Sequence, residues 1–244
     1  MLRARLERTE QQAASRQRQL ERYAADLREV FKQERTRAQE LRRSYRATVR
    51  ALSNAVEARD AYTGKHAERV AAYGLELAKI VDPDLAYDPQ LEFGFLLHDV
   101  GKVAVPDSIL HKPAALTEGE VEVMRRHPVL GSEIVSHIDF LQTGAKNVVR
   151  HHHERWDGGG YPDHLAGDEI PRPARIFAVA DSLDAITTDR PYRRGAPIAD
   201  ARREIARGSG TQFDPDAVEA LMEVPDDVLQ RIRDEALLTS VAAP

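Results

Sequence analysis

The chain has 244 residues and contains no cysteine. Disulfide bonds and thiolate metal sites are therefore excluded, which is compatible with a reducing compartment. No segment approaches the roughly 18 consecutive apolar residues that indicate a membrane span. The opening Met-Leu-Arg-Ala-Arg does not lead into the apolar core of a signal peptide. From these absences we expect a cytoplasmic protein without a membrane span.

Glycine and proline are also absent between Leu6 and Leu52, where Arg, Glu, Gln, Ala and Leu dominate. Most of these residues favour helices. Apolar side chains recur at alternating spacings of four and three, as in a heptad repeat: Leu20, Ala24, Leu27, Phe31, Ala38, Leu41, Tyr45 and Leu52. We predict a long N-terminal helix that forms a homodimeric coiled coil. A single helix packed on its own domain, or a solvated basic helix, is the alternative.

Charge divides the chain into two parts. Residues 1–50 carry 14 Lys and Arg against 7 Asp and Glu, whereas residues 51–244 carry a net charge of −12. We therefore predict a linker helix over 1–50 and one globular domain over 51–244. The acidic domain argues against a nucleic-acid partner, because binding to phosphates needs a basic surface. Such a rod typically links a sensor to an output domain, so either it docks a regulatory partner or the chain belongs to a larger architecture.

The rest of the chain has a helical pattern with few candidate strands. Predicted helices cover residues 67–80, 89–98, 117–126, 129–138, 145–153 and 173–187, with two more after residues 198 and 214. Thr117 and Glu120 have the spacing of a capping box, and Asp214 precedes Pro215 as an N-cap precedes a first-turn proline. These signals predict an all-α domain.

His98 and Asp99 form the first candidate metal-binding pair. The imidazole nitrogen can bind one metal while the carboxylate bridges to a second. A lone His-Asp pair is more often a surface or capping pair. Gly101-Lys102 and further His and Asp clusters nearby in the sequence favour the metal-binding interpretation.

A run of three histidines, His151 to His153, precedes a glycine-rich turn that ends in Tyr161-Pro162. Adjacent side chains on a helix diverge by about 100°, so neighbouring histidines share a site only where a helix ends. Gly158 predicts such an end. A solvated, tag-like run is the alternative, but the internal position favours His152 and His153 as ligands, with His151 outside the site.

Asp181 and Asp184 lie three residues apart, on one face of the predicted helix 173–187. The neighbouring residues are apolar, so we expect both carboxylates to be mostly buried. Burial of a carboxylate is costly unless a cation compensates it. We predict a metal at Asp181, and for Asp184 a metal and a salt bridge to Arg175 or Arg190 both remain open.

Together these motifs resemble the HD-GYP family of metal-dependent cyclic di-GMP phosphodiesterases. The matching blocks are Asp60 to His66, Leu96 to Lys102, Pro106 to Leu110, His127-Pro128 with Gly131, the stretch 152–162, and the segments 170–171, 178–181 and 189–193. The resemblance covers roughly residues 51–218. It implies an all-α, HD-type helical bundle as the catalytic domain.

The resemblance also implies a ligand set for two metal ions. His66, His98, Asp99 and Asp181 would hold one ion, and Asp99, His127, His152 and His153 would hold the other. Mixed imidazole and carboxylate ligands suit iron or manganese better than a closed structural zinc. Tyr62 stands where some members have a glutamate for a third ion, so we expect two. Gly159 stands where Ser or Thr is frequent, which should loosen the turn.

The implied reaction is hydrolysis of cyclic di-GMP to pGpG, or onward to GMP, by a hydroxide that bridges the two ions. Asp99 would be the bridging ligand and Lys102 would stabilise phosphate charge. Lys102, Tyr161, Arg190 and Arg193 would contact the substrate. A surface role is the alternative for Lys102.

Three other functions stay open. The domain could bind nucleotides or proteins without turnover. It could be another HD-superfamily phosphohydrolase that acts on dNTPs, ppGpp or a different cyclic dinucleotide. Interaction of the rod and the Gly-Tyr-Pro loop with diguanylate cyclases or other regulators can coexist with catalysis.

Overall fold

The computed structural model describes residues 2–59, 65–189 and 193–241, and the side chains of 15–59, 65–189 and 193–235. It divides into two compact units, Met1–Thr48 and Val49–Pro244. Within the described residues there is no β-strand, and Ser209 and Phe213 form an isolated bridge. The predicted all-α class is confirmed.

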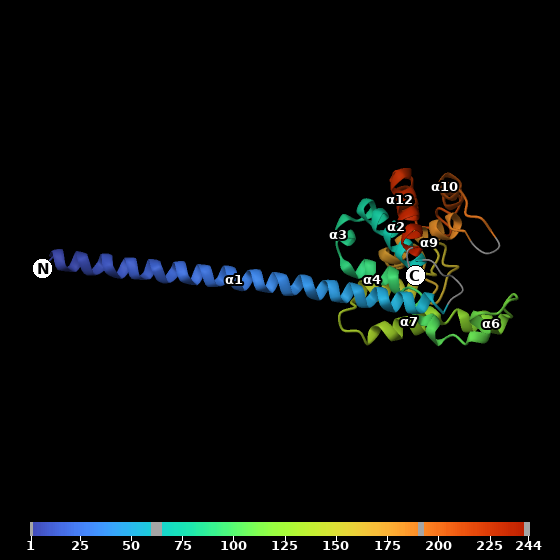
Figure 1. The fold of residues 1–244 in the computed structure, drawn as a ribbon. Coiled ribbons are helices and arrows are strands. Elements are labelled where there is room, and N and C mark those ends of the chain that lie inside the picture. The colour runs from blue at the N-terminus through green and yellow to red at the C-terminus, as the bar shows by residue number, and fades with distance from the viewer. Residues whose placement is uncertain (1, 60–64, 190–192, 242–244) are drawn as a thin grey trace. The chain divides into compact units, whose positions relative to one another are not determined.

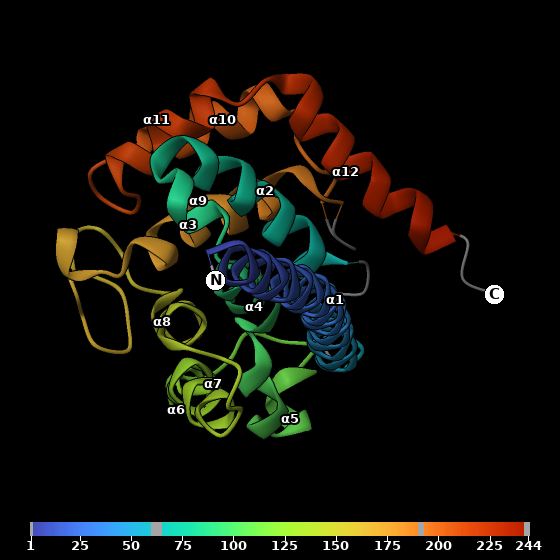
Figure 2. The same ribbon diagram turned by 90° about the vertical axis from the view of Figure 1, so that its left-hand side faces the viewer.

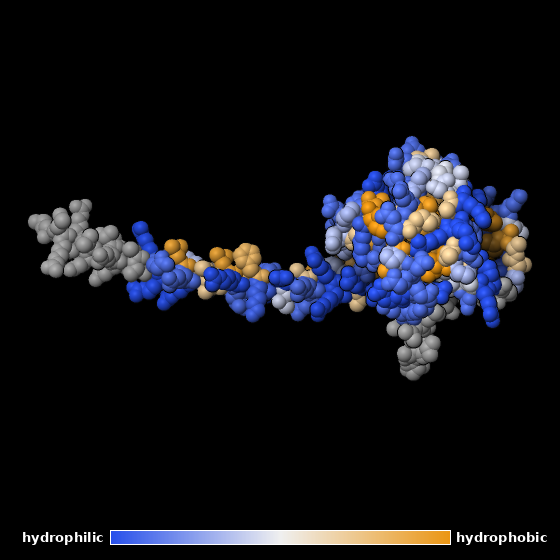
Figure 3. All heavy atoms as spheres, turned by 90° about the horizontal axis from the view of Figure 1, so that it is seen from above, coloured by the Kyte–Doolittle hydropathy of each residue, from blue (hydrophilic) through white to orange (hydrophobic). Residues whose placement is uncertain are grey.

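Helix α1 spans Leu2–Glu57, as the absence of glycine and proline predicted. In the first unit of the chain, apolar side chains of α1 lie along the helix (Figure 3). Six of them are between 51% and 72% exposed: Leu20, Tyr23, Leu27, Val30, Phe31 and Leu41. Polar side chains one turn apart also contact each other, as in the 3.0 Å hydrogen bond from Gln17 to Glu21. Among the helices of the described residues, none combines the length and apolar character that a bilayer crossing requires.

The second unit is a bundle of short helices (Figure 1). They are α2 (His66–Val81), α3 (Pro83–Ala86), α4 (Pro89–Leu97), η1 (Val100–Ala104), α5 (Asp107–Leu110), α6 (Glu118–Met124), α7 (His127–Ser136), α8 (Thr143–His151), η2 (Gly167–Glu169), α9 (Arg172–Thr187), α10 (Ile198–Arg207), α11 (Pro215–Glu223) and α12 (Asp226–Val241). The predicted helices are confirmed to within a few residues, whereas α3, α5 and α12 were not predicted as separate helices.

Two predicted helix starts are confirmed in detail. The amide of Thr117 donates to Glu120 Oε2 at 2.7 Å, and the amide of Glu120 donates back to Thr117 Oγ1 at 3.4 Å. Asp214 accepts a hydrogen bond from the amide of Asp216, with Pro215 as the first residue of α11. These caps satisfy amides that have no partner within the helix.

Helices α2, α4, α8 and α9 form the core. Every residue of α4 except Pro89 is buried, because α4 packs between α2 and α8 (Figure 2). Helix α9 packs against both α2 and α8, and the rings of Phe95 and Phe177 lie 5.5 Å apart between α4 and α9. This packing brings the start of α2, the end of α4, the end of α8 and the middle of α9 to one place.

Candidate metal centre

The ends of four helices carry the predicted histidine ligands. His66 is the first residue of α2, and His127 is the first residue of α7. His98 and His152 directly follow α4 and α8 as their C-caps. Asp99 precedes η1, and Asp181 lies within α9. All six residues come together in the structure, and their role as ligands stays a prediction.

Asp99 lies at the centre of this cluster. Its Oδ2 is 3.2 Å from His98 Nε2, and its Oδ1 is 3.2 Å from His127 Nε2 and 3.9 Å from His152 Nε2. Lys102 Nζ is 2.8 Å from Oδ2. Burial raises the pKa of Asp99, but His98, Lys102 and His127 outweigh it and hold that pKa well below its usual value. Asp99 is therefore an ionised carboxylate whose two oxygens face different imidazoles.

The outer nitrogens of three histidines are held by backbone carbonyls. Nδ1 of His98, His127 and His152 lies 2.8 to 2.9 Å from the carbonyl oxygens of residues 95, 124 and 149. A carbonyl oxygen only accepts hydrogen bonds, so each Nδ1 carries the proton. In the neutral ring, Nε2 then presents a lone pair to the centre, as metal-binding histidines do.

This arrangement fits a metal ion. Nε2 of His127 and Nε2 of His152 are 3.1 Å apart. Burial, followed by the charges of His153 and His127, holds the pKa of His152 well below its usual value. Burial and His127 lower the pKa of His153 to about 3. Two imidazole Nε2 atoms that face each other at this distance suit a cation held between them.

The end of α8 allows adjacent histidines to face the same centre. Helix α8 ends at His151, two residues before the predicted end at residue 153, and the rings of His152 and His153 lie 4.2 Å apart. Ligand atoms of His127, His152 and His153 all lie within 4.8 Å of one another. His151 points elsewhere, since its Nε2 lies 3.0 Å from Asp163 Oδ2. A histidine cluster that could bind a metal is thus present.

Two glycines shape the site through close backbone approach. A Cβ at Gly101 would lie 1.9 Å from the His127 carbonyl oxygen, so only glycine lets η1 cross the start of α7 and brings Asp99 to His127. A Cβ at Gly160 would lie 2.4 Å from the amide nitrogen of Arg155. The turn at Gly160 stacks the Tyr161 ring on His153, with centroids 4.8 Å apart.

The second part of the site joins α2 to α9. His66 Nε2 lies 3.3 Å from Asp181 Oδ1, and His66 Nδ1 lies 2.8 Å from Asp184 Oδ2. Burial lowers the pKa of His66, but the hydrogen bond to Asp184 and the charge of Asp181 outweigh it and raise the pKa to about 9. A metal that binds His66 therefore replaces a proton there.

Asp181 is partly buried, and its side chain is 33% exposed where it lines the cavity described below. The expectation for Asp184 needs correction. Asp184 is buried, but its cation is Arg69, whose Nε lies 2.5 Å from Asp184 Oδ1. Arg175 instead pairs with Asp168 and Asp214. Arg69 lies on α2, far away in sequence, so spacing within α9 could not reveal it.

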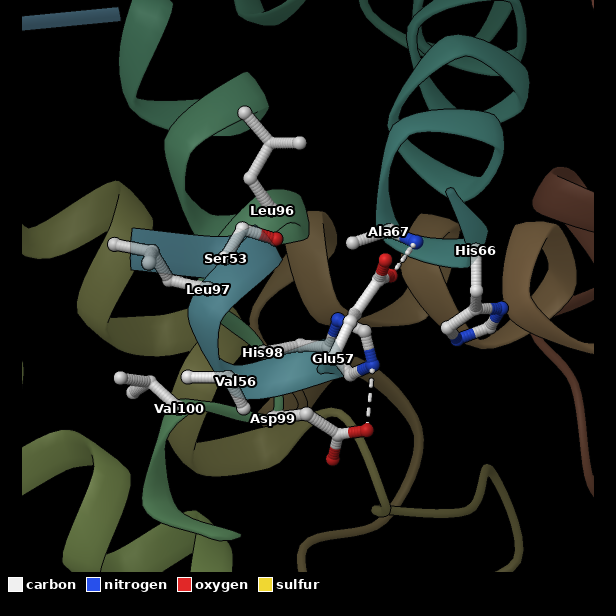
Figure 4. A pocket seen from close by; sticks show the side chains of 10 residues that line it. All are labelled: Ser53, Val56, Glu57, His66, Ala67, Leu96, Leu97, His98, Asp99 and Val100. Carbon is white, nitrogen blue, oxygen red and sulfur yellow. Dashed lines mark hydrogen bonds and ion pairs between the residues drawn. The ribbon is translucent and has the colours of Figure 1, made fainter. Parts of the chain in front are cut away.

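An open cavity borders the cluster. Its volume is about 750 Å³, including space open to solvent, which is within the range of ligand sites. It is lined by Val56, Glu57, His66, His98, Asp99, Lys102, His152, His153, Asp181 and Ala185. A smaller space of about 250 Å³ shares five lining residues with it, and Ser53, Val56 and Glu57 of α1 border that space (Figure 4). Val56 and Glu57 precede all the motifs, and nothing in their sequence marked them as site residues.

The predicted substrate contacts have different surroundings. Lys102 lines the cavity. Tyr161 stacks on His153, and the guanidinium of Arg125 lies 5.3 Å from the Tyr161 ring centre. Arg193 donates a 2.5 Å hydrogen bond to the carbonyl of Ala185, a cavity residue. Arg190 and Tyr62 lie outside the described residues.

Known proteins match this chain over the region that contains the histidine cluster. A family model for the HD domain matches residues 50–217. The 3'3'-cGAMP-specific phosphodiesterase 2 of Vibrio cholerae is 41% identical over 78% of this chain and 37% of its own length. A cyclic di-GMP phosphodiesterase of Thermotoga maritima is 41% identical over 73% of this chain and 50% of its own length.

A solved structure shows the same fold. Bd1817, an HDG"Y"P protein from Bdellovibrio bacteriovorus, superposes with a TM-score of 0.51 at 21% identity, over 68% of this chain and 52% of its own. The chain thus spans half or less of the length of both curated relatives. The resemblance inferred from the motifs is confirmed at the level of the family.

Proposed function

Because the chain belongs to the HD domain family, we propose that residues 51–244 form a catalytic domain that hydrolyses the phosphodiester bonds of a cyclic dinucleotide, with cyclic di-GMP as the first candidate. The observation that carries this proposal is the placement of Asp99, whose two oxygens each lie 3.2 Å from a different imidazole. A carboxylate in this position suits a bridge between two ions. The names of the two curated relatives support the substrate class.

The proposed centre holds two ions of iron or manganese. His66, His98, Asp99 and Asp181 would hold one ion, and Asp99, His127, His152 and His153 would hold the other. This mixture of imidazole and carboxylate donors without thiolate fits those metals. When bound, the ions would supply a nucleophile from water at neutral pH and neutralise charge on the phosphate.

The protein's own side chains would bind and orient the phosphodiester. Lys102 lines the cavity 2.8 Å from Asp99, so its ammonium group is close enough to stabilise the charge that grows on a phosphate oxygen. Arg193 and Arg190 would hold the phosphates, and Tyr161 would border the bound nucleotide. In the reaction, water adds to phosphorus, one P–O bond of the ring breaks, and the leaving oxygen takes a proton. Opening one bond of cyclic di-GMP gives pGpG, and a second hydrolysis gives GMP.

A second candidate substrate is 3'3'-cGAMP. It is favoured by the Vibrio cholerae relative, whose name specifies that dinucleotide. Both substrates have the same ring of two phosphodiesters and differ in one base. The metal centre would treat them alike, so base contacts outside it would decide between them.

Residues 1–50 are proposed to pair with a second copy of this chain. Leu27 and Phe31 are 57% and 72% exposed on α1 and lie on the heptad stripe. A parallel or antiparallel helix from another copy would cover such a stripe. The absence of cysteine fits the proposed cytoplasmic setting.

The decisive experiment uses the full chain, purified without oxygen. It is incubated separately with cyclic di-GMP and 3'3'-cGAMP, and products are separated by chromatography. We expect the linear dinucleotide to form with at least one substrate, and chelator-treated protein to form none until Mn²⁺ or Fe²⁺ is restored. Metal-loaded protein that opens neither ring would overturn the proposal and leave a binding role.

A further inference from the structure

Arg59 follows the end of α1 and reaches the segment that carries Lys102. Its guanidinium donates to the carbonyl of Val103 at 2.7 Å and to the carbonyl of Val105 at 3.3 Å. It also donates to Asp107 Oδ1 at 2.6 Å. A fourth contact, to the carbonyl of Lys102, lies at 3.5 Å, the limit for a hydrogen bond. One side chain thus contacts four residues between positions 102 and 107, shortly after Asp99.

The segment η1 needs support of this kind. It is a five-residue 3-10 helix, a form with poorer hydrogen-bond geometry than an α-helix. The carbonyls of Val103 and Val105, at and just after its end, accept hydrogen bonds from Arg59. Gly101 packs η1 against α7 on one side, whereas Val103 is 42% exposed. Lys102 therefore lies between Gly101, which packs against α7, and Val103, whose carbonyl accepts a hydrogen bond from Arg59.

Backbone hydrogen bonds hold the two residues that follow the end of α1, Ala58 and Arg59. The amide of Ala58 donates to the carbonyl of Asn54, and the amide of Arg59 donates to that of Val56. Val56 is only 5% exposed. The backbone of Arg59 is therefore hydrogen-bonded to the last turn of α1, from which its guanidinium reaches the other segment.

Glu57, two residues earlier, makes a matching contact on the other side of the cavity. Its Oε1 accepts a 2.6 Å hydrogen bond from the amide of Ala67, which directly follows His66 (Figure 4). The carboxylate thereby satisfies an amide in the first turn of α2. Glu57 and Arg59 together contact both the segment of His66 and the segment of Lys102.

From these contacts we infer that Arg59 is a positioning residue that holds Lys102 at the phosphate through η1. The inference rests on the proposed phosphodiesterase function, since it assigns the role of Arg59 to that reaction. Lys102 must reach a charge that develops at one atom, and displacement by about 1 Å at such a contact can cost on the order of 100-fold in rate. Arg59 makes no contact with the proposed metal ligands themselves, so its removal should leave metal binding intact.

The first test compares Arg59→Gln with the parent in metal-loaded protein that comprises all 244 residues of the chain. We expect kcat to fall by about 10- to 100-fold with parental metal content. Arg59→Lys keeps a charge and one donor, so it should lose less. Asp107→Asn is the matched control, because it removes the exposed ion pair and keeps the carbonyl contacts. It should keep kcat within about 2-fold of the parent, since exposed ion pairs contribute little.

A double-mutant cycle separates positioning from general destabilisation. If Arg59 acts through Lys102, Arg59→Gln should have little further effect on kcat in the Lys102→Ala protein. A merely structural loss would reduce kcat by the same factor in both backgrounds. Additive effects on kcat would overturn the inference. Loss of metal from an Arg59→Gln protein that is still folded would also overturn it, and Arg59→Lys serves as the folded reference.

Hydrogen exchange gives a readout that does not need activity. The amides of Lys102 and Val105 donate at 2.9 and 3.1 Å within η1, and both should exchange faster in Arg59→Gln than in the parent. Amides of α9 should exchange at parental rates. Unchanged exchange at residues 102–105 would overturn the positioning role. A parent that is loaded with metal and inactive would instead overturn the proposed function, whatever the exchange result.

Discussion

Asp184 Oδ2 lies 2.8 Å from Nδ1 of His66, and the same carboxylate accepts two hydrogen bonds from Arg69. The carboxylate thus fixes the ring of His66 so that Nε2 faces Asp181. Arg69 keeps the buried carboxylate ionised, and the pKa of Asp184 is lowered because these hydrogen bonds and charges outweigh its burial. Asp184 therefore supports a predicted ligand and is not itself directed at the centre.

Replacement of Asp184 should consequently affect both stability and metal binding. We expect Asp184→Asn to lower the free energy of unfolding by about 3 kcal/mol, because Arg69 loses the buried carboxylate that accepts two of its hydrogen bonds. Metal affinity should fall by about 10- to 100-fold with the loss of the carboxylate behind His66. Thermal unfolding and metal titration measure the two effects.

Asp168→Asn is the control for that variant. The Asp168 side chain is 90% exposed, and its partner Arg175 retains Asp214. The change in stability should stay below about 1 kcal/mol. Equal effects of Asp168→Asn and Asp184→Asn would contradict a special role for the buried pair.

Gly101 gives a prediction about the backbone. Gly101→Ala should separate η1 from α7, because the new methyl group would lie 1.9 Å from the His127 carbonyl oxygen. Asp99 would then move away from His127, and we expect most of the metal and activity to be lost. Gly119→Ala is the matched control, since no atom lies within 4 Å of its added carbon and alanine favours helices. Elemental analysis that finds parental metal in Gly101→Ala would refute this account.

Local signals made much of the fold predictable. Thr117 with Glu120 and Asp214 with Pro215 mark helix starts by their own side chains, and the structure confirms both. His152 and His153 were assigned to one site because Gly158 indicated that the helix ends before it. Each of these inferences depends on residues within about one or two helical turns.

Contacts between distant segments could not be predicted in this way. Arg69 and Asp184 are separated by 115 residues, and Arg59 and Asp107 by 48. The sequence around Arg69 and around Arg59 does not distinguish either residue from an arginine on the protein surface. Their partners are set by how α2 packs on α9 and by where α1 ends relative to η1, which depends on the whole core.

Asp99 and Lys102 should have separable effects on the reaction. Asp99→Ala should lose metal and activity together, because it removes the carboxylate between two sets of imidazoles. Lys102→Ala should keep its metal and lose about 10²- to 10³-fold in kcat, the scale of one contact to transition-state charge. Metal content and product release are measured for each protein. Lys112→Ala removes a lysine that pairs with Glu120 and should retain parental activity; an Asp99→Ala protein with full activity would exclude the bridging role.

The number and kind of ions follow from the donor set. We expect about two iron or manganese ions per chain after purification without oxygen, since the cluster offers imidazole and carboxylate donors and the chain has no cysteine. Elemental analysis of the parent decides the matter. A single tightly bound zinc, or three ions per chain, would refute the assignment, and three ions would also show that Tyr62 does not exclude a third site.

The exposed stripe on α1 leads to a prediction about assembly. Leu27 and Leu41 are 57% and 51% exposed, so burial of the exposed half of each side chain would contribute about 1 kcal/mol. Pairing of two copies along the stripe would bury them in a heptad seam, where a charge is strongly unfavourable. The parent should therefore be a dimer by light scattering, and the double variant Leu27→Asp, Leu41→Asp should be a monomer. The double variant Gln19→Asp, Gln33→Asp adds the same charges away from the stripe and should stay dimeric, so a monomeric parent, or dissociation by both variants alike, would exclude the coiled coil.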